Sequence, residues 1–237
     1  MKTFNFLVMF IIVTSCCNLI TEGNSGSGNV TREVREITSF NTLNLAVVFD
    51  VLIIPSDSEK VIVETDDNLQ ELVLVENDGE TLIVKMKPES KICKKTRGKV
   101  FIYSKEIKGI TNSSVGMLEN EGILKAKTLR LNNSSVGKTV LKIEADELTI
   151  NNSAVGNTEL SGSCNDLILK NSAVGELNAI DLHCNNLDLD NKSVGKTTVF
   201  VNNECNINNS AVGSLDIYGK GVVKNISNTG IGKFQKH

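Results

Sequence analysis

The stretch Asn152-Ser153-Ala154-Val155-Gly156 recurs along the chain with small changes. Every copy has asparagine first, a small or polar residue second, Ser, Ala or Gly third, Val or Ile fourth and Gly last. The seven copies begin at Asn112, Asn133, Asn152, Asn171, Asn191, Asn209 and Asn228. Neighbouring copies start 18 to 21 residues apart. A steady period of about 19 residues predicts one structural unit stacked on copies of itself.

Apolar and polar residues alternate just before each copy. Leu148 and Ile150 stand four and two residues before Asn152, and apolar residues hold these two places in most other copies. This period of two predicts a strand whose inward face carries the aliphatic side chains, the asparagine and the small residue. We also expect the following Val or Ile to point inward. That would break the alternation and require a corner, where the Gly that always follows suits the bend.

The repeat contains short strands and tight corners, and no stretch shows helical periodicity. Leucine-rich repeats of similar length require a helical or equivalent convex segment, and helical repeats are longer. The sequence therefore predicts an all-β fold, a single-stranded parallel β-helix with coils of about 19 residues. The right-handed form is favoured, because the strict six-residue period of the left-handed form is absent.

The seven asparagines share the inward face, which favours a structural role. Each side-chain amide carries two donors and one acceptor, so stacked amides can bond to one another or to backbone groups at the corner. A satisfied internal ladder of this kind stabilises the stack and fixes its register. The functional alternative is that the row binds a ligand. The structural role is favoured because all seven occur where the corner needs them.

The N-terminal residues have the pattern of an export signal. Lys2 precedes an apolar run that ends at Val13, and Thr14 and Ser15 lead to Cys16. We expect residues 1–15 to be a lipoprotein signal peptide and Cys16 to be lipidated, anchoring the chain to a membrane. The alternative is an ordinary signal peptide with an incidental cysteine. By resemblance to bacterial sorting behaviour, the lack of Asp after Cys16 favours the outer membrane, facing the periplasm or the cell surface.

The remainder divides into a tether and one continuous domain. Residues 16–33 are rich in Asn, Gly, Ser and Thr and predict a flexible tether. Residues 34–110 lack the repeated phrase but are strand-like. They predict an N-terminal β cap with irregular early coils, since a bare strand edge at the end of a stack invites aggregation. Residues 111–237 are the expected regular coils.

Charged residues are distributed unevenly along the chain. The formal net charge is only −3 and does not indicate nucleic-acid binding. Residues 46–80 hold ten acids and one base, whereas residues 85–108 hold nine bases and two acids. One interpretation is that oppositely charged strands face each other. The other is a patch for anionic glycan or lipid head groups. This patch would comprise Lys91, Lys94, Lys95, Arg97 and Lys99.

The cysteines suggest one cross-link and no metal site. Cys164 and Cys184 occupy the same column of adjacent coils, where stacked Cα atoms suit a disulfide in an exported protein. The alternative is that both are small buried thiols, as we expect for Cys205 in an aliphatic column. His183 and His237 are the two histidines of the chain, too few for a zinc site built on histidines, and no cofactor is expected.

Catalysis is considered because many parallel β-helices degrade polysaccharides, and glycoside hydrolysis needs two positioned carboxylates. Acids that should face outward are Asp146, Asp166, Asp181, Asp188 and Asp190. They form no cluster with Arg, Lys or His that differs from a solvated surface, and the many serines belong to the repeat. The sequence therefore favours a protein that is not an enzyme, with a polysaccharide lyase or hydrolase as the alternative.

Several features together resemble one family. These are the lipoprotein signal, the Gly26–Asn29 tether and the approach to Val47-Val48-Phe49-Asp50-Val51, followed by Ser/Ala-x-Gly corners every 20 residues or so. Residues 34–232 resemble the auto-transporter adhesin head domain (GIN domain) family of Bacteroidetes. Asn-Ser-Ala-Val-Gly stands where relatives more often have Ser-Gly corners. The resemblance implies an exported β-helical protein with an adhesin label, and it supplies no catalytic residues.

The predicted function is a lipid-anchored, non-enzymatic module of the cell envelope, either adhesin-like or structural at the surface. A rigid repetitive face can present evenly spaced polar side chains to a glycan or to a surface protein. The outward serines that would do so are Ser113, Ser134, Ser153, Ser172 and Ser210. Plain solvation of these serines is the alternative.

Overall fold

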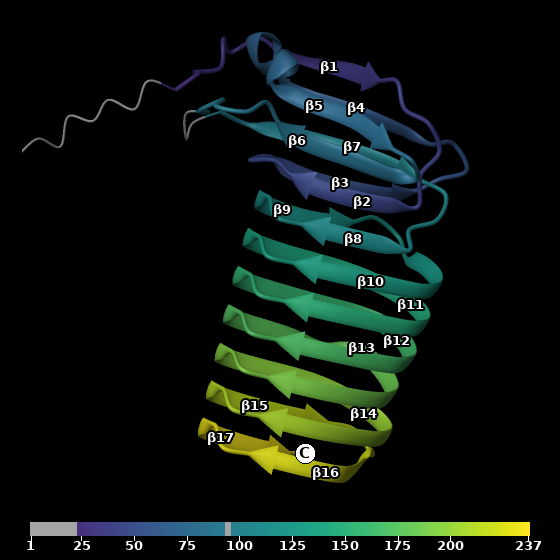
Figure 1. Ribbon diagram of the computed structural model, residues 1–237, viewed down its shortest axis with the longest axis vertical. Coiled ribbons are helices and arrows are strands. Elements are labelled where there is room, and N and C mark those ends of the chain that lie inside the picture. Colours follow the sequence, from purple (N-terminus) through teal and green to yellow (C-terminus); the bar gives the residue numbers. More distant parts are fainter. Residues whose placement is uncertain (1–22, 93–95) are drawn as a thin grey trace, which may run out of the picture.

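The computed structural model describes residues 23–92 and 96–237. They form an elongated stack of coils with a more irregular end formed by the N-terminal half (Figure 1). The fold is nearly all-β, a parallel β-solenoid of about 7 turns with coils of about 19 residues, which confirms the predicted fold class. Among the described residues, no helix has the length and apolar character needed to cross a membrane.

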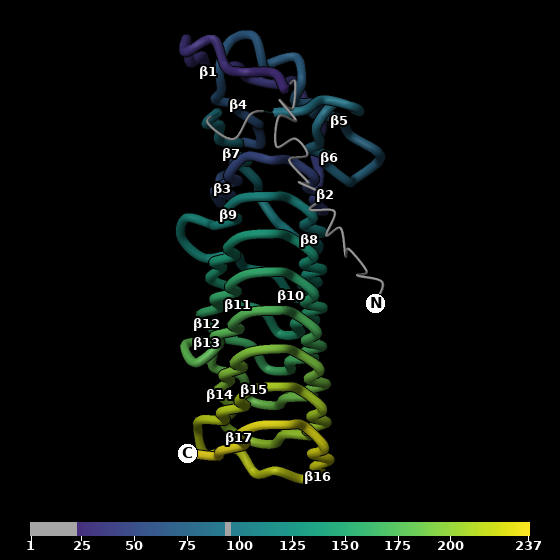
Figure 2. The backbone as a smooth tube through the Cα atoms, turned by 90° about the vertical axis from the view of Figure 1, so that its left-hand side faces the viewer, coloured from purple at the N-terminus to yellow at the C-terminus, as the bar shows by residue number. Residues whose placement is uncertain are grey.

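The regular coils follow the period of the sequence. Their strands are β8 (Gly109–Asn112), β9 (Val115–Asn120), β10 (Leu124–Asn133), β11 (Val136–Asn152), β12 (Val155–Asn171), β13 (Val174–Asn191), β14 (Val194–Asn209), β15 (Val212–Tyr218), β16 (Val222–Asn228) and β17 (Ile231–Lys236). Each long strand begins at the Val after one corner and ends at the Asn of the next. It runs as two legs joined by a bend, and Figure 2 shows the coils stacked along the long axis. Parallel pairing keeps equivalent residues opposite each other, such as Asn152 and Asn171.

The cap contains the strands that precede the regular coils. They are β1 (Val30–Arg35), β2 (Thr42–Ala46), β3 (Asp50–Pro55), β4 (Lys60–Asp66), β5 (Val73–Asp78), β6 (Thr81–Met86) and β7 (Gly98–Ser104), with the 3-10 helix η1 (Asp67–Leu72). β2 lies between β6 and β8, and β3 lies between β7 and β9, all in parallel. The coil built from β2 and β3 is therefore first in sequence but not at the end of the stack (Figure 1).

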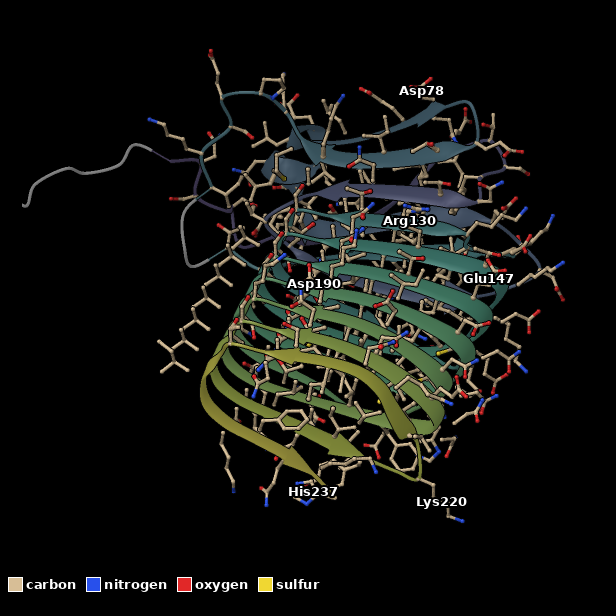
Figure 3. All side chains as sticks on the ribbon, turned by 60° about the horizontal axis from the view of Figure 1, so that its bottom comes forward. Asp78, Arg130, Glu147, Asp190, Lys220 and His237 are labelled. Carbon is tan, nitrogen blue, oxygen red and sulfur yellow. The ribbon has the colours of Figure 1, made fainter. Side chains whose placement is uncertain are left out.

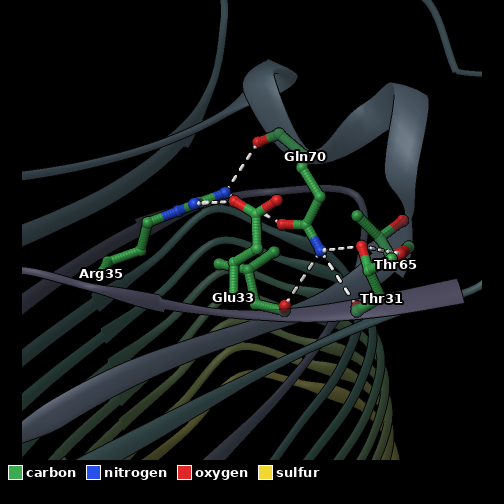
Figure 4. A network of polar contacts seen from close by, with 6 residues as sticks. Thr31, Glu33, Arg35, Thr65 and Gln70 are labelled. Atoms are coloured by element: carbon green, nitrogen blue, oxygen red, sulfur yellow. Dashed lines mark hydrogen bonds and ion pairs between the residues drawn. The ribbon is translucent and has the colours of Figure 1, made fainter.

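Antiparallel strands finish the N-terminal end. β1 pairs with β4 and β4 with β7, while β5 pairs with β6. Gln70 of η1 is buried, and its side-chain amide donates to the backbone oxygens of Thr31 and Val63 at 3.0 and 3.2 Å. Arg35 donates to both oxygens of Gln70 at 2.9 Å and also pairs with Glu33 (Figure 4). These bonds hold η1 against β1. Together with the antiparallel strands, η1 forms the cap that covers the first coils.

The folded region begins upstream of the boundary predicted at residue 34. β1 starts at Val30, and Asn24 bridges to Ile92. Ser27 and Asn29 donate side-chain hydrogen bonds to the carboxylate of Asp67 at 2.5 and 2.9 Å, which lowers the pKa of Asp67. The second part of the predicted tether therefore lies on the cap. Cys16 and the expected signal peptide lie outside the described residues.

The interior holds an aliphatic core beside a polar ladder. Leu and Ile side chains at the two alternating places are buried, among them Leu148, Ile150 and Leu169. The Nδ2 atom of each ladder asparagine donates to the Oδ1 atom of the next at 2.8 to 3.2 Å, from Asn112 to Asn228. Thr158 and Thr197 add hydrogen bonds to the same row. This geometry is what a structural ladder requires.

The expectation that the Val column points inward is wrong. The residues Val115, Val136, Val155, Val174, Val194, Val212 and Ile231 are between 48% and 73% exposed. Alternation in fact continues through the corner, so Asn152 and Ala154 are buried while Ser153 and Val155 are exposed. Apolar character does not imply burial here, because a β-branched residue also favours the extended backbone of an exposed strand position.

The corner glycines are required by close backbone contact. Gly156 has a φ of +130°, and a Cβ atom added there would lie 2.0 Å from the backbone oxygen of Gly137 in the preceding coil.

We expect Gly156→Ala to lower the free energy of unfolding by at least about 3 kcal/mol, because the cost of the strained φ and the cost of the clash add. Gly79→Ala is the control, since its φ is +57° with open space around the added atom. Urea denaturation should show that Gly79→Ala lowers the free energy of unfolding by only about 1 kcal/mol. Equal losses for the two variants would contradict the stacking geometry.

The ladder generates a second prediction. Asn171→Ala removes the acceptor of Asn152 and the donor to Asn191 and Thr197. Because buried partners are left unsatisfied, the free energy of unfolding should fall by about 2–4 kcal/mol. Asn208 donates to Asp190 at 3.0 Å on the exposed surface, so Asn208→Ala is the matched control. It should change stability by less than about 0.5 kcal/mol. The structural role of the ladder is refuted if both variants melt like the wild type.

Candidate functional site

A groove crosses the coils at the bend between their two legs. Its volume is about 810 Å³. The floor has small side chains from successive coils: Ala126 of β10, Ala145 of β11 and Cys164 of β12. These positions are paired in register, Ala126 with Ala145 and Ala145 with Cys164. The groove therefore follows the stacking direction and repeats with the strand spacing of about 4.8 Å.

One polar row borders this floor on each side. The residues just before the bend are Lys125, Glu144, Ser163 and His183, and those just after it are Lys127, Asp146, Asn165 and Asn185. Glu106 and Asn202 complete the lining. Each of these coils thus contributes one polar side chain to each rim, and the floor between the rims is built from the small side chains of Ala and Cys.

The rims carry their own hydrogen bonds. Lys125 pairs with Glu144 at 3.0 Å. On the other rim, Asn185 donates to Asn165 at 3.0 Å and Asn165 donates to Asp146 at 3.4 Å. These contacts hold the side chains in rows and use only part of the hydrogen-bonding capacity of their carboxylate, amide and ammonium groups. Such rows suit a long ligand with repeated hydroxyl groups.

The acids predicted to face outward are distributed over separate places. Asp146 is at the groove rim, whereas Asp166 accepts a hydrogen bond from Asn186 at 2.8 Å. Asp190 is paired with Lys192, and Asp181 is exposed. Asp166 and Asp188 line a smaller hollow of about 290 Å³ together with Glu204. The structure thus brings only Asp146 of this set to the main groove.

The outward serines at the corner form hydrogen bonds to the neighbouring backbone. The hydroxyl groups of Ser134, Ser153 and Ser172 donate to backbone oxygens of the preceding coil at 3.3 to 3.5 Å. Ser113 does the same to Leu45 at 3.0 Å. Sequence reasoning chose this column and missed the groove. The available signal was the small residue that stands seven places before most of the repeated asparagines, such as Ala126, Ala145 and Cys164.

Two lysines of the basic segment lie against acids of neighbouring strands. Lys99 lies opposite Glu64 in register and forms an ion pair with Glu119 at 3.0 Å. Lys85 and Glu76 pair at 2.8 Å across the hairpin of β5 and β6. Lys94 and Lys95 lie outside the described residues. Elsewhere charges lie around the exterior, from Asp78 at the cap to Lys220 at the other end (Figure 3).

The two cysteines of the bend column are adjacent. Cys164 and Cys184 are Cα partners, and both are free thiols in this structure. The Cys184 thiol donates to the backbone oxygen of Phe200 at 3.0 Å. A hydrogen bond with Cys184, and next to it burial, raises the pKa of the Cys164 thiol well above its usual range. Within residues 23–92 and 96–237, no group of His, Cys, Asp and Glu could hold a metal ion.

The comparisons with known proteins give the same architecture. A family model described as "Putative auto-transporter adhesin, head GIN domain" matches residues 39–221, and no curated protein matches the chain. A solved structure called a "putative adhesin", from Bacteroides fragilis NCTC 9343, has a TM-score of 0.84 and 21% identity over 91% of this chain and 100% of its own.

Two structures from Parabacteroides distasonis ATCC 8503 are also similar. One is called a "putative adhesin", with a TM-score of 0.61 and 18% identity over 89% of this chain and 99% of its own. The other is called a "Putative lipid binding protein", with a TM-score of 0.61 and 16% identity over 90% of this chain and 100% of its own. At these identities the likeness shows the fold.

Proposed function

Because the chain belongs to the family of auto-transporter adhesin head (GIN) domains, we propose that it is a non-enzymatic binding module of the cell envelope. Its ligand is an extended glycan that lies along the groove of the bend column. The observation that carries this proposal is the pair of polar rims, one side chain per coil, on either side of a floor whose residues Ala126, Ala145 and Cys164 are paired in register.

The chemistry of the lining favours a glycan over a lipid. Carboxylate, amide and ammonium groups on both rims can exchange hydrogen bonds with sugar hydroxyls. An acyl chain would need a wide apolar lining, because lipid binding depends on burying apolar surface. Here the floor is built from side chains no larger than that of cysteine. A repeating polymer also matches the repeat of the coils, whereas a compact ligand would use only part of the groove.

The carboxylates of the groove favour binding over cleavage. Glu144 is paired with Lys125, and Asp146 accepts from Asn165. A glycoside hydrolase needs one carboxyl group that stays protonated to act as the acid. Carboxylates that are already held by neighbouring side chains instead serve as acceptors for hydroxyl groups.

The module is held at the outer membrane by lipid on Cys16. The support is the sequence before it, with Lys2, the apolar run to Val13 and the small residues Thr14 and Ser15. Acyl chains on one terminal cysteine are enough for stable anchoring when more than one is present. The groove is then presented on a rod fixed to the envelope.

Groove binding is tested with glycan arrays and titration of the best-bound glycans. Ala145→Phe fills the floor and should weaken binding at least about tenfold, because the ring occupies the ligand's place. Ala46→Phe is the matched control, since Ala46 is exposed on β2 of the cap and is absent from the groove lining. Equal affinity of both variants would contradict the site. Glycan fragments released by the wild-type protein would contradict the non-enzymatic assignment.

The anchor is tested with two neighbouring cysteines. We expect Cys16→Ser to abolish labelling by radioactive palmitate and to release the protein from the membrane fraction, because the thiol that carries the lipid is removed. Cys17→Ser should be labelled and sediment like the wild type. If Cys16→Ser is labelled and Cys17→Ser is not, the lipid is attached to Cys17 instead. Labelling of both variants would refute lipidation at a single cysteine.

A further inference from the structure

Cys164 and Cys184 are placed for a covalent bond between coils. They are directly opposite in the parallel pairing of β12 and β13. Neighbouring strands lie about 4.8 Å apart, within the range of about 4.4–6.8 Å between the Cα atoms of disulfide-bonded cysteines.

The third buried cysteine differs in position. Cys205 of β14 is opposite Leu187 in the aliphatic column, whereas Cys184 is opposite Val201. The pair is thus set apart from Cys205 by register. Cys164 is 5% exposed at the groove floor, and Cys184, in the same column of the next coil, is fully buried.

We propose that Cys164 and Cys184 form a disulfide bond that joins β12 to β13 across the floor of the groove. The two thiols together lose two protons and two electrons as one S–S bond forms. A disulfide of the oxidising compartment accepts these electrons and protons and is reduced to two thiols. The bond is independent of what the groove binds.

The state of the thiols determines when the bond forms. Only a thiolate that the oxidant can reach attacks its disulfide, and in the folded coils Cys164 is 5% exposed and Cys184 is fully buried. The bond therefore forms during folding, before β13 closes over β12. Once formed, it is shielded from reductants by the same burial. It closes a loop of about 20 residues, which restricts the unfolded chain.

The direct test uses the full chain, made with its own leader and isolated from the cell envelope under alkylating conditions without reductant. Peptide mass analysis should find Cys164 linked to Cys184, and Cys205 alkylated only after denaturation. Alkyl groups on both Cys164 and Cys184, or a link from either to Cys93, would overturn the proposal.

Variants supply a second readout. Refolding the wild-type protein in reductant should lower its Tm by about 5–8 °C relative to the oxidised form. Cys164→Ala should fold, because Ala126 and Ala145 hold the same column, and its Tm should not respond to reductant. Cys205→Ala is the control and should keep the full response. A reductant response that persists in Cys164→Ala would refute the bond.

Discussion

Hydrogen bonds between inward asparagine amides set the register on which the rest of the structure depends. Each Nδ2 atom donates to the Oδ1 atom of the next coil, so the ladder has one direction from Asn112 to Asn228. A strand shifted by one residue would turn every inward side chain outward. It would also leave several buried amides without partners, so one register is strongly preferred.

Because the register is fixed, a pattern of residues in one coil lies directly above the same pattern in the next. Because every coil bends at the same place, small residues such as Ala145 and Cys164 stack into a groove floor. Their polar neighbours form continuous rims for the same reason. The groove and the cysteine pair are thus consequences of stacking, and each needs contributions from coils about 19 residues apart in sequence. A single coil could present neither feature.

The regular coils were predictable because each residue there is repeated in the same environment. The period of the asparagines specified the coil length, and the alternation of Leu148 and Ile150 specified the buried face. The Val column was misjudged, since hydrophobicity alone does not distinguish an exposed β-branched residue from a buried one. The place of β2 and β3 within the stack follows from long-range pairing with β6 to β9, which leaves no periodic trace. The start of β1 at Val30 was hidden by a composition typical of linkers. Only part of the groove could be recognised from the sequence, as a column of small residues. The bend that makes this column the floor of a groove could not.

The most direct measurement of the account is hydrogen exchange of asparagine side-chain amides, followed by NMR on protein labelled with ¹⁵N-asparagine. The buried amides of the ladder, such as Asn152, Asn171 and Asn191, should exchange at least about a hundredfold more slowly than the exposed amides of Asn185 and Asn208. Uniformly fast exchange of all asparagine amides would contradict an internal ladder that holds the coils in register.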